Sequence, residues 1–293
     1  MFTPFAFRSV KIEEAPAPPS WTPADFTDIK AWWKADSGIT MSTTDTSRVQ
    51  RWDDYINGYP VTQSFDSNPN LTAVERSPTT ASAWADLNNQ PIVRFGITTN
   101  GTYPNGAPQY MYSTGSFPAL SSESYTQIII CEYISSKTAG ETISAPMLGH
   151  TNTNSVKRIW FDRTLSDGDM RNVVGLGAAA LQVVDTNTNI ALGSEKVLWQ
   201  QYQAATGDTY TGNNTTTGSL QYNGSVTNDT WISTTLFGIN AILVGTSNLG
   251  GLSLTRANDM AVAEVILIYG EPSASEWAEF KSYVSTKYGI TIS

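Results

Sequence analysis

The chain has 293 residues, enough for one large β domain, and its formal net charge is −9. Such an acidic chain lacks the Lys and Arg clusters that phosphate contacts need, so we expect no nucleic-acid partner. Hydrophobic residues make up 40% of the chain and charged residues 15%. No apolar run approaches the ~20 residues of a membrane span, so we expect a globular protein without membrane insertion.

Residues 1–20 differ in composition from the rest of the chain. Phe2, Phe5 and Phe7 precede the segment "APAPPS", which favours extended polyproline geometry and is typical of a stiff spacer. We interpret these residues as an extended N-terminal arm that anchors the domain on another chain; an edge strand packed on its own domain is the alternative. No basic start with an apolar stretch and cleavage site is visible, so we expect no secretory signal.

From residue 21 onward the chain is predicted to form short strands separated by turns rich in Gly, Asn and Thr. "TQIIICEYI" is apolar on both faces, which indicates a central strand covered on both sides. Asn57-Gly58 and Asn223-Gly224 are hairpin-turn signals. The remaining predicted strands are "KAWWKAD", "VQRWD", "QPIVRFG", "QYMYS", "RIWFD", "ALQVV", "KVLWQQY", "SLQY", "NAILVGT" and "MAVAEVILIYG".

Strands of this length, without alternating helices, favour an all-β, two-sheet antiparallel sandwich of jelly-roll type over residues 21–293. We expect residues 42–47 and 206–219, which are rich in Thr and Ser, to be loops.

The chain is predicted to close with a short helix packed on the sandwich. Ser273 and Glu276 have the spacing of a capping box, and Gly289 can take the left-handed conformation that ends a helix. Between them one apolar stripe follows helical spacing: Trp277, Phe280, Val284 and Tyr288. The preceding strand is the nearest apolar surface in sequence that could cover this stripe.

These segments carry a resemblance to a known family. "VAEVILIYGEPSASEWAEFKSYVSTKYGI" resembles the end of bacterial and bacteriophage proteins with a concanavalin A-like (laminin-G-like) jelly roll. "IKAWWKADSGI", "VQRWDD", "QPIVRFG" and "SLQYNGSV" resemble further motifs of that family in the same order. The resemblance covers most of residues 21–293. It implies the fold, and little about activity, since one fold hosts lectins, hydrolases and structural modules.

We find no signature of a glycoside hydrolase, which would place paired carboxylates on one strand in the pattern "ExDxE". The acidic pairs Asp53-Asp54 and Asp167/Asp169 are expected to be turn or solvated residues. The single histidine, His150, lies outside any nucleophile motif, and the single cysteine, Cys131, is expected to be a buried strand residue. We therefore predict a non-enzymatic protein without a required cofactor.

Two kinds of ligand remain open. Calcium could bind through Asp167, Asp169 or Asp259, as the resemblance to laminin-G-like and lectin proteins suggests. A glycan could stack on exposed aromatic rings, for which the candidates are Tyr103, Tyr110, Tyr112 and Trp231; the alternative is that these rings fill the core.

Together with the arm, the resemblance suggests a structural protein on the surface of a tailed-bacteriophage virion, made in the host cytoplasm. Through Phe2, Phe5 and Phe7 it would bind other virion proteins. It would be a homo-oligomer that serves adhesion to host glycans, as a tail or fibre component, or decorates the capsid. The alternatives are a glycan-active hydrolase of the same fold and a bacterial surface adhesin domain.

Overall fold

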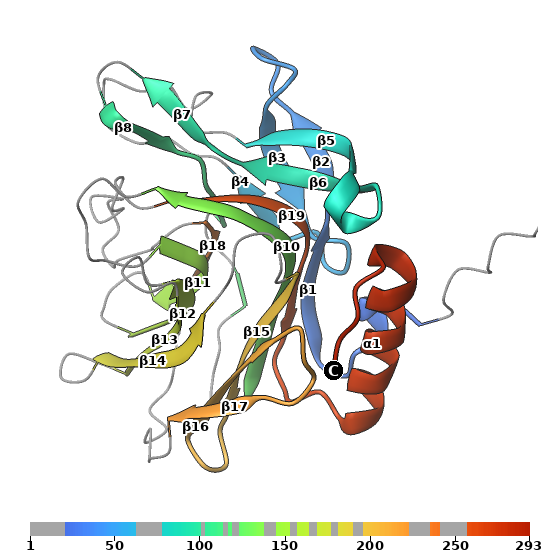
Figure 1. Ribbon diagram of the computed structural model, residues 1–293, viewed down its shortest axis with the longest axis vertical. Coiled ribbons are helices and arrows are strands. Elements are labelled where there is room, and N and C mark those ends of the chain that lie inside the picture. The colour runs from blue at the N-terminus through green and yellow to red at the C-terminus, as the bar shows by residue number, and fades with distance from the viewer. Residues whose placement is uncertain are drawn as a thin grey trace, which may run out of the picture.

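The computed structural model describes residues 21–62, 78–100, 103–113, 117–118, 123–137, 145–152, 157–163, 169–176, 181–189, 196–222, 235–240 and 257–293. Over these residues the chain forms two large antiparallel sheets that face each other, with a helix on the outside of one of them (Figure 1). The predicted fold class is therefore confirmed. The arm, residues 1–20 with Phe2, Phe5 and Phe7, lies outside the described residues, and its separation from the domain stays a prediction.

The first sheet carries the helix. Its strands follow the order β17 (Ser219–Tyr222), β16 (Asp208–Asn213), β15 (Val197–Gln203), β10 (Tyr125–Lys137), β19 (Ala257–Ile268), β6 (Gln90–Phe95) and β5 (Thr79–Trp84), with β1 (Ile29–Lys34) also paired to β19.

The second sheet faces it across the core. Its order is β14 (Leu181–Asn189), β13 (Asp169–Leu176), β12 (Lys157–Arg163), β11 (Ala145–Asn152), β18 (Thr235–Ile239), β9 (Met111–Tyr112), β4 (Pro60–Thr62), β3 (Val49–Asp53) and β2 (Ile39–Met41). A separate pair joins β7 (Ile97–Asn100) to β8 (Tyr103–Pro108), and two short 3₁₀ helices are η1 (Pro23–Asp25) and η2 (Ala85–Leu87).

Strand β10 separates two apolar cores, as its sequence predicts. Ile129 and Cys131 point into the core between the sheets, whereas Ile128 and Ile130 point to the core beneath the helix. The Cys131 side chain is fully buried, and that burial raises the pKa of its thiol to about 12. Cys131 is therefore a packing residue, as expected from the sequence.

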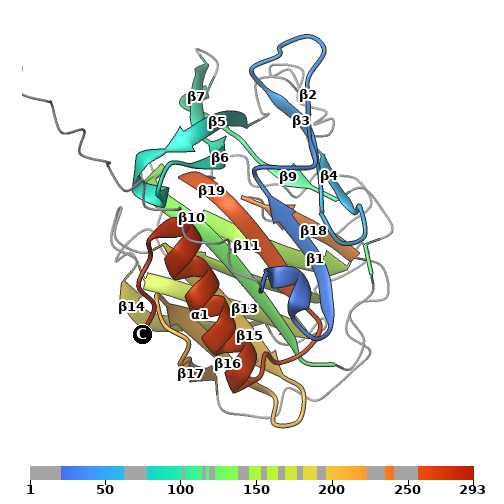
Figure 2. The same ribbon diagram turned by 90° about the vertical axis from the view of Figure 1, so that its right-hand side faces the viewer.

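Helix α1 (Ala274–Tyr288) lies across the outer face of the first sheet (Figure 2). The Ser273 side chain and Glu276 form the predicted capping box, and Gly289 ends the helix with φ of 66°. The predicted stripe is buried, together with Tyr283, in the core beneath the helix. No helix within the described residues is long and apolar enough to cross a membrane.

One predicted loop contains a strand. Residues 206–219 include β16, which pairs with β15 from Gln203↔Asp208 to Leu198↔Asn213. Alternation explains the strand, because Thr209 and Thr211 are buried while Tyr210 points to the opposite core. Threonine is β-branched and suits a strand, so reading a Thr-rich segment as a loop was wrong.

Other predictions near the turns have mixed outcomes. The Asn57-Gly58 turn connects β3 to β4, with Gly58 at φ of 71°. The Asn223-Gly224 turn and most of "NAILVGT" lie outside the described residues. The strand that pairs in this part of the chain is β18, directly before "NAILVGT".

Two strands share one edge of β19. β1 pairs with the C-terminal half of β19, ending at Lys34↔Glu264, and β6 pairs with the N-terminal half from Val93↔Val262. Just past the end of β1, the Ala35 N–H donates to the carbonyl of Ala263 at 2.9 Å. The two strands diverge here, and Glu264 lies at the fork.

Candidate functional site

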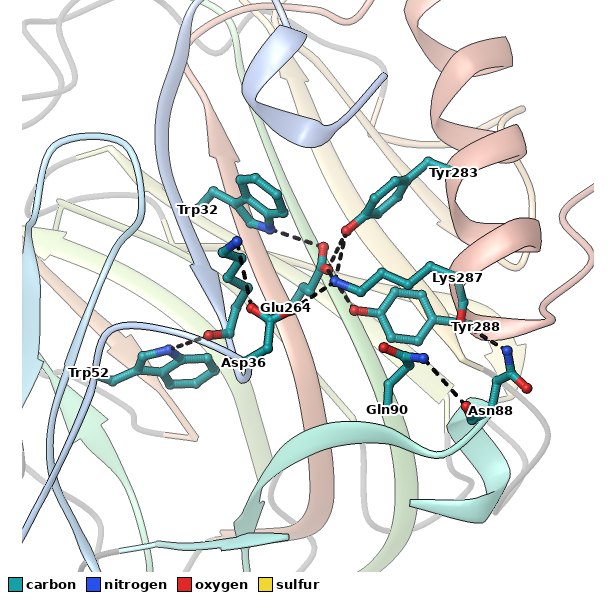
Figure 3. A network of polar contacts seen from close by, with 10 residues as sticks. Trp32, Asp36, Trp52, Asn88, Gln90, Glu264, Tyr283, Lys287 and Tyr288 are labelled. Atoms are coloured by element: carbon teal, nitrogen blue, oxygen red, sulfur yellow. Dashed lines mark hydrogen bonds and ion pairs between the residues drawn. The ribbon is translucent and has the colours of Figure 1, made fainter. Parts of the chain in front are cut away.

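Glu264 is a buried carboxylate at this fork, with 0% of the residue exposed. Alternation along β19 directs it to the helix side, where donors from β1 and α1 converge on it (Figure 3). Its two oxygens accept hydrogen bonds from Trp32 Nε1 at 3.0 Å, Tyr288 Oη at 2.6 Å, Lys287 Nζ at 2.8 Å and Tyr283 Oη. Oε2 accepts from Trp32 and Oε1 from the other three donors, so both oxygens are hydrogen-bonded, as a buried charge requires.

Lys287 joins this carboxylate to the surface. Its ammonium nitrogen also lies 3.3 Å from Asp36 Oδ2, and Asp36 Oδ1 lies 3.6 Å from Lys34 Nζ. Burial by itself lowers the pKa of Lys287, but the Glu264 and Asp36 carboxylates outweigh burial and raise that pKa above its usual value. For Tyr283 and Tyr288, burial and then the negative charge of Glu264 raise both pKa values, so both phenols remain donors.

The motifs that carry the family resemblance meet in this network. "AWWKAD" supplies Trp32 and Asp36, "AEV" supplies Glu264, and "KYG" supplies Lys287 and Tyr288. The network joins the first strand to the last strand and the closing helix, and Trp32 and Glu264 are 232 residues apart in the chain. These motif residues therefore have a structural role in docking α1 on the sheet.

A cleft of ≈ 410 Å³ opens beside the network, between α1, β1 and the turn that starts β6. Its lining combines aromatic surface with amides, hydroxyls and two ammonium groups: Thr22, Trp32, Lys34, Asn88, Gln90, Tyr283, Thr286 and Lys287. Asn88, left-handed at φ of 53°, donates from Nδ2 to the carbonyl of Lys287 at 3.1 Å. This bond ties one wall of the cleft to the helix, so the cleft is built from fixed elements.

Tyr55 stands next to the cleft and is 57% exposed, more than any other large hydrophobic residue whose side chain the structure describes. Its ring meets the Trp32 ring edge-on at 5.3 Å, and the Lys34 ammonium lies 3.9 Å from its centre. Since Trp32 and Lys34 both line the cleft, Tyr55 lies directly beside it.

The turn that carries Tyr55 is held by Asp54. This buried carboxylate accepts backbone N–H bonds from Ile56 at 2.8 Å, Asn57 at 3.1 Å and Tyr59. The Tyr55 N–H in turn donates to the carbonyl of Trp32 at 2.7 Å. Asp54 is thus a turn residue, as predicted. Its neighbour Asp53 pairs with Arg51 at 2.7 Å.

The carboxylates beside the cleft are poorly suited to acid–base chemistry on a ligand in it. Glu264 has four donors and no exposed surface, and neither Glu264 nor Asp36 lines the cleft. A general acid or base must reach the substrate with a free oxygen. The arrangement favours binding, in which the exposed Tyr55 ring contacts apolar surface and the amide groups of the cleft contact hydroxyls.

A second pair of carboxylates lies on the same face of the sheet. Glu132 on β10 pairs with Ala261 on β19, whose side chain lies in the core beneath the helix. Asp259 is two residues before Ala261 on β19, so alternation places both carboxylates on the helix side of the sheet. Glu132 accepts from Trp84 Nε1 and lies 3.8 Å from Lys196 Nζ, while Asp259 lies 2.6 Å from Arg94 Nη2.

The two carboxylates of this pair are partly exposed, at 12% and 20% of their side chains. Burial raises the pKa of Asp259, and the Arg94 charge offsets part of that rise. The sequence search missed this pair because it looked for carboxylates on one strand, and these come from two.

The aromatic residues predicted to bind sugar are not gathered in the cleft. Tyr110 and Tyr112 are each 2% exposed, and their rings stack on each other with centroids 6.2 Å apart. Both positions match the alternative of core residues. Tyr103 begins β8, away from the cleft, and its side chain is outside the described part of the structure, as is all of Trp231.

The predicted calcium ligands are also apart. Asp259 is paired with Arg94, Asp169 begins β13 opposite Asn189 instead of lying in the predicted turn, and Asp167 lies outside the described residues. His150 lies on β11 between Ile159 and Phe237. Among the described residues, no group of three or more His, Cys, Asp or Glu side chains could hold a metal ion.

No family model and no curated protein matches this sequence. Among solved structures, the chain is similar to an arabinofuranosidase complexed with arabinofuranosyl-α-1,2-xylobiose, with TM-score 0.52 and 14% identity over 84% of this chain. This chain spans 52% of that enzyme.

Two further similarities have lower TM-scores. Domain 4 of an extracellular arabinanase from Geobacillus stearothermophilus, complexed with arabinotriose, has TM-score 0.49 and 11% identity, over 87% of this chain and 98% of that one. A heptameric pentraxin from Limulus polyphemus has TM-score 0.45 and 9% identity, over 65% of this chain and 81% of that one. The similarity to the arabinofuranosidase bears out the fold part of the family resemblance, a jelly-roll sandwich.

The comparison corrects the prediction of a non-enzymatic protein. That prediction rested on the missing one-strand carboxylate signature, yet the chain is similar to a glycoside hydrolase. The chain is thus a two-sheet sandwich similar in fold to this arabinofuranosidase.

Proposed function

We propose that the protein binds a glycan in the cleft beside α1. The observation that carries this proposal is the lining of the cleft, which combines the aromatic residues Trp32 and Tyr283 with the amide side chains of Asn88 and Gln90. Sugar rings have apolar faces that pack on aromatic side chains, and hydroxyls at their edges that pair with amides. The cleft volume, ≈ 410 Å³, lies within the usual range of small-ligand sites, roughly 300–1,000 Å³.

The test is calorimetric titration with neutral saccharides, including arabinofuranosyl-α-1,2-xylobiose, which is the sugar bound by the structural neighbour. Gln90→Ala removes an amide from the cleft wall. A lost hydrogen bond of ~1.4 kcal/mol would weaken binding by about tenfold. Lys281→Ala is the control, because Lys281 is exposed on α1 and does not line the cleft. Equal binding by Gln90→Ala and wild type would contradict the proposed site.

A second candidate function is glycan hydrolysis by the Glu132/Asp259 pair. The favouring observation is that two partly exposed carboxylates lie on one face of the sheet, with Glu132 facing an ammonium and an indole N–H and Asp259 facing a guanidinium. Two neighbouring carboxylates are the usual acid and base of glycoside hydrolysis. Asp259 would protonate the leaving oxygen while Glu132 takes a proton from the attacking water.

This candidate is tested with 4-nitrophenyl glycosides. Wild-type protein should release 4-nitrophenol, and Glu132→Gln and Asp259→Asn should each reduce the rate by at least about a hundredfold. Glu279→Gln, an exposed substitution on α1, serves as the control. Unchanged rates in both variants, or no release by the wild type, would refute hydrolysis at this pair.

The place of the protein in a virion stays a prediction from the sequence resemblance, as do homo-oligomerisation and the alternative of an adhesin domain. Its support is the aromatic arm with Phe2, Phe5 and Phe7 and the proline-rich spacer. Removal of residues 1–20 should leave a folded domain that no longer joins the particle. Unfolding of the truncated chain would show that the arm belongs to the core.

A further inference from the structure

We propose that Tyr55 forms a second sugar subsite outside the cleft, so that the ligand is a neutral saccharide of at least two units. This inference rests on the proposed glycan binding and adds the size and charge class of the ligand. No sequence pattern pointed to Tyr55, which lies in the turn "DDYING" and would ordinarily be read as a surface residue.

The first argument is the exposure of the Tyr55 ring. Tyr55 is 57% exposed, whereas the other large hydrophobic residues whose side chains the structure describes are buried or only partly exposed. An isolated exposed aromatic residue is common on protein surfaces and needs no explanation by itself. Tyr55 differs because both of its ring partners, Trp32 and Lys34, also line the cleft.

The second argument is rigidity. An aromatic platform contributes to affinity when little conformational freedom is lost on binding. Asp54 holds the turn through three backbone N–H groups, and the Tyr55 N–H is bonded to the neighbouring strand at 2.7 Å. The ring itself is buttressed by the edge contact with Trp32 at 5.3 Å. The platform is therefore formed before the ligand arrives.

The third argument concerns charge. Lys34 and Lys287 are the cationic groups of the cleft, and each is paired with a carboxylate: Lys34 with Asp36 at 3.6 Å, and Lys287 with Glu264 at 2.8 Å. These two lysines and two carboxylates carry no net formal charge. With a chain of net charge −9, the site has no unpaired positive charge to offer an acidic sugar. A neutral saccharide fits these groups best.

The geometry points to one sugar unit in the cleft, against the amides of Asn88 and Gln90, and the next unit stacked on Tyr55. A monosaccharide would use only the cleft. A longer oligomer would gain the Tyr55 contact, so affinity should rise from one unit to two and then level off.

The experiment is titration of wild type, Tyr55→Ala and Tyr55→Phe with glucose, galactose, xylose and arabinose and with their linear oligomers of two to four units. Tyr55→Ala should weaken oligomer binding about tenfold, as for the loss of one strong aromatic contact, and leave monosaccharide binding unchanged. Tyr55→Phe keeps the ring and should bind oligomers like wild type. Raising NaCl from 50 to 500 mM should change the affinity less than twofold, because a neutral ligand releases no counterions.

The outcomes separate the two proposals. If wild type binds none of these sugars, the proposed function fails. If oligomers bind and Gln90→Ala weakens them while Tyr55→Ala does not, the cleft stands and the Tyr55 subsite is refuted. Equal affinity for one and two units, or a steep dependence on salt, would also overturn this inference.

Discussion

Replacing Glu264 by glutamine tests whether the buried network docks the closing helix. The substitution keeps the shape of the side chain and removes its charge. The carboxamide oxygen can still accept from the phenols, but its NH₂ group would face the indole N–H of Trp32, which now donates at 3.0 Å. The Lys287 ammonium, 2.8 Å from the carboxylate, would lose its buried counter-charge.

The structure sets the size of the effect. Removing one partner of a buried ion pair costs about 3–5 kcal/mol, because the other charge stays behind in a site of low polarity. Lys287 keeps Asp36 at 3.3 Å and retains 19% side-chain exposure, so part of its charge remains compensated. We therefore expect the lower end, about 3 kcal/mol, which is a large share of a typical domain stability of roughly 5–15 kcal/mol.

The assay is urea unfolding at pH 7 followed by tryptophan fluorescence, with Glu279→Gln on the exposed face of α1 as the control for the same change of side chain. Glu264→Gln should lower the unfolding midpoint at an unchanged slope. The double variant Glu264→Gln/Lys287→Met should recover at least about 1 kcal/mol, because it removes the stranded ammonium. A loss below about 1 kcal/mol for Glu264→Gln, or no recovery in the double variant, would refute the reasoning.

Three other substitutions or conditions test neighbouring features. Gly212→Ala would place a Cβ 2.1 Å from Nε1 of the Trp199 ring, so it should lower the free energy of unfolding, measured by thermal unfolding, by about 1–3 kcal/mol. Gly96→Ala is the control: its Cβ would have its nearest contact at 3.5 Å, so the free energy of unfolding should hardly change. Ser273→Ala removes the helix cap and should cost about 1 kcal/mol by urea unfolding, whereas an unchanged midpoint would show that packing alone holds the first turn. The raised pKa of Lys287 means that the folded state holds this proton more tightly than the unfolded state. The contribution of Lys287 to folding stability is intact below about pH 10.5 and should fall as the pH rises through the folded pKa. Folding stability measured from pH 9 to 12 should therefore fall less steeply in Lys287→Met than in the wild type.

Local patterns in the sequence were sufficient for the elements that depend on neighbours along the chain. The helix followed from its cap residues, its stripe and Gly289, and each of these features is contained within one short segment. The two-faced apolar run of β10 likewise indicated a central strand before any partner was known. The Thr-rich strand β16 was missed because composition was read without alternation.

The candidate site was decided by tertiary structure. Trp32, Glu264 and Lys287 each belong to a motif that was recognised in the sequence, yet nothing in the spacing of those motifs shows that they meet around one carboxylate. Tyr55 carried no signal at all, because its exposure depends on how the turn after β3 packs against β1. Periodicity reports which face of an element is buried, since that is a local property of the chain. Which side chains share a cleft depends on strand order and on where β1 and β6 diverge along β19, and those are long-range properties that only the folded structure supplies.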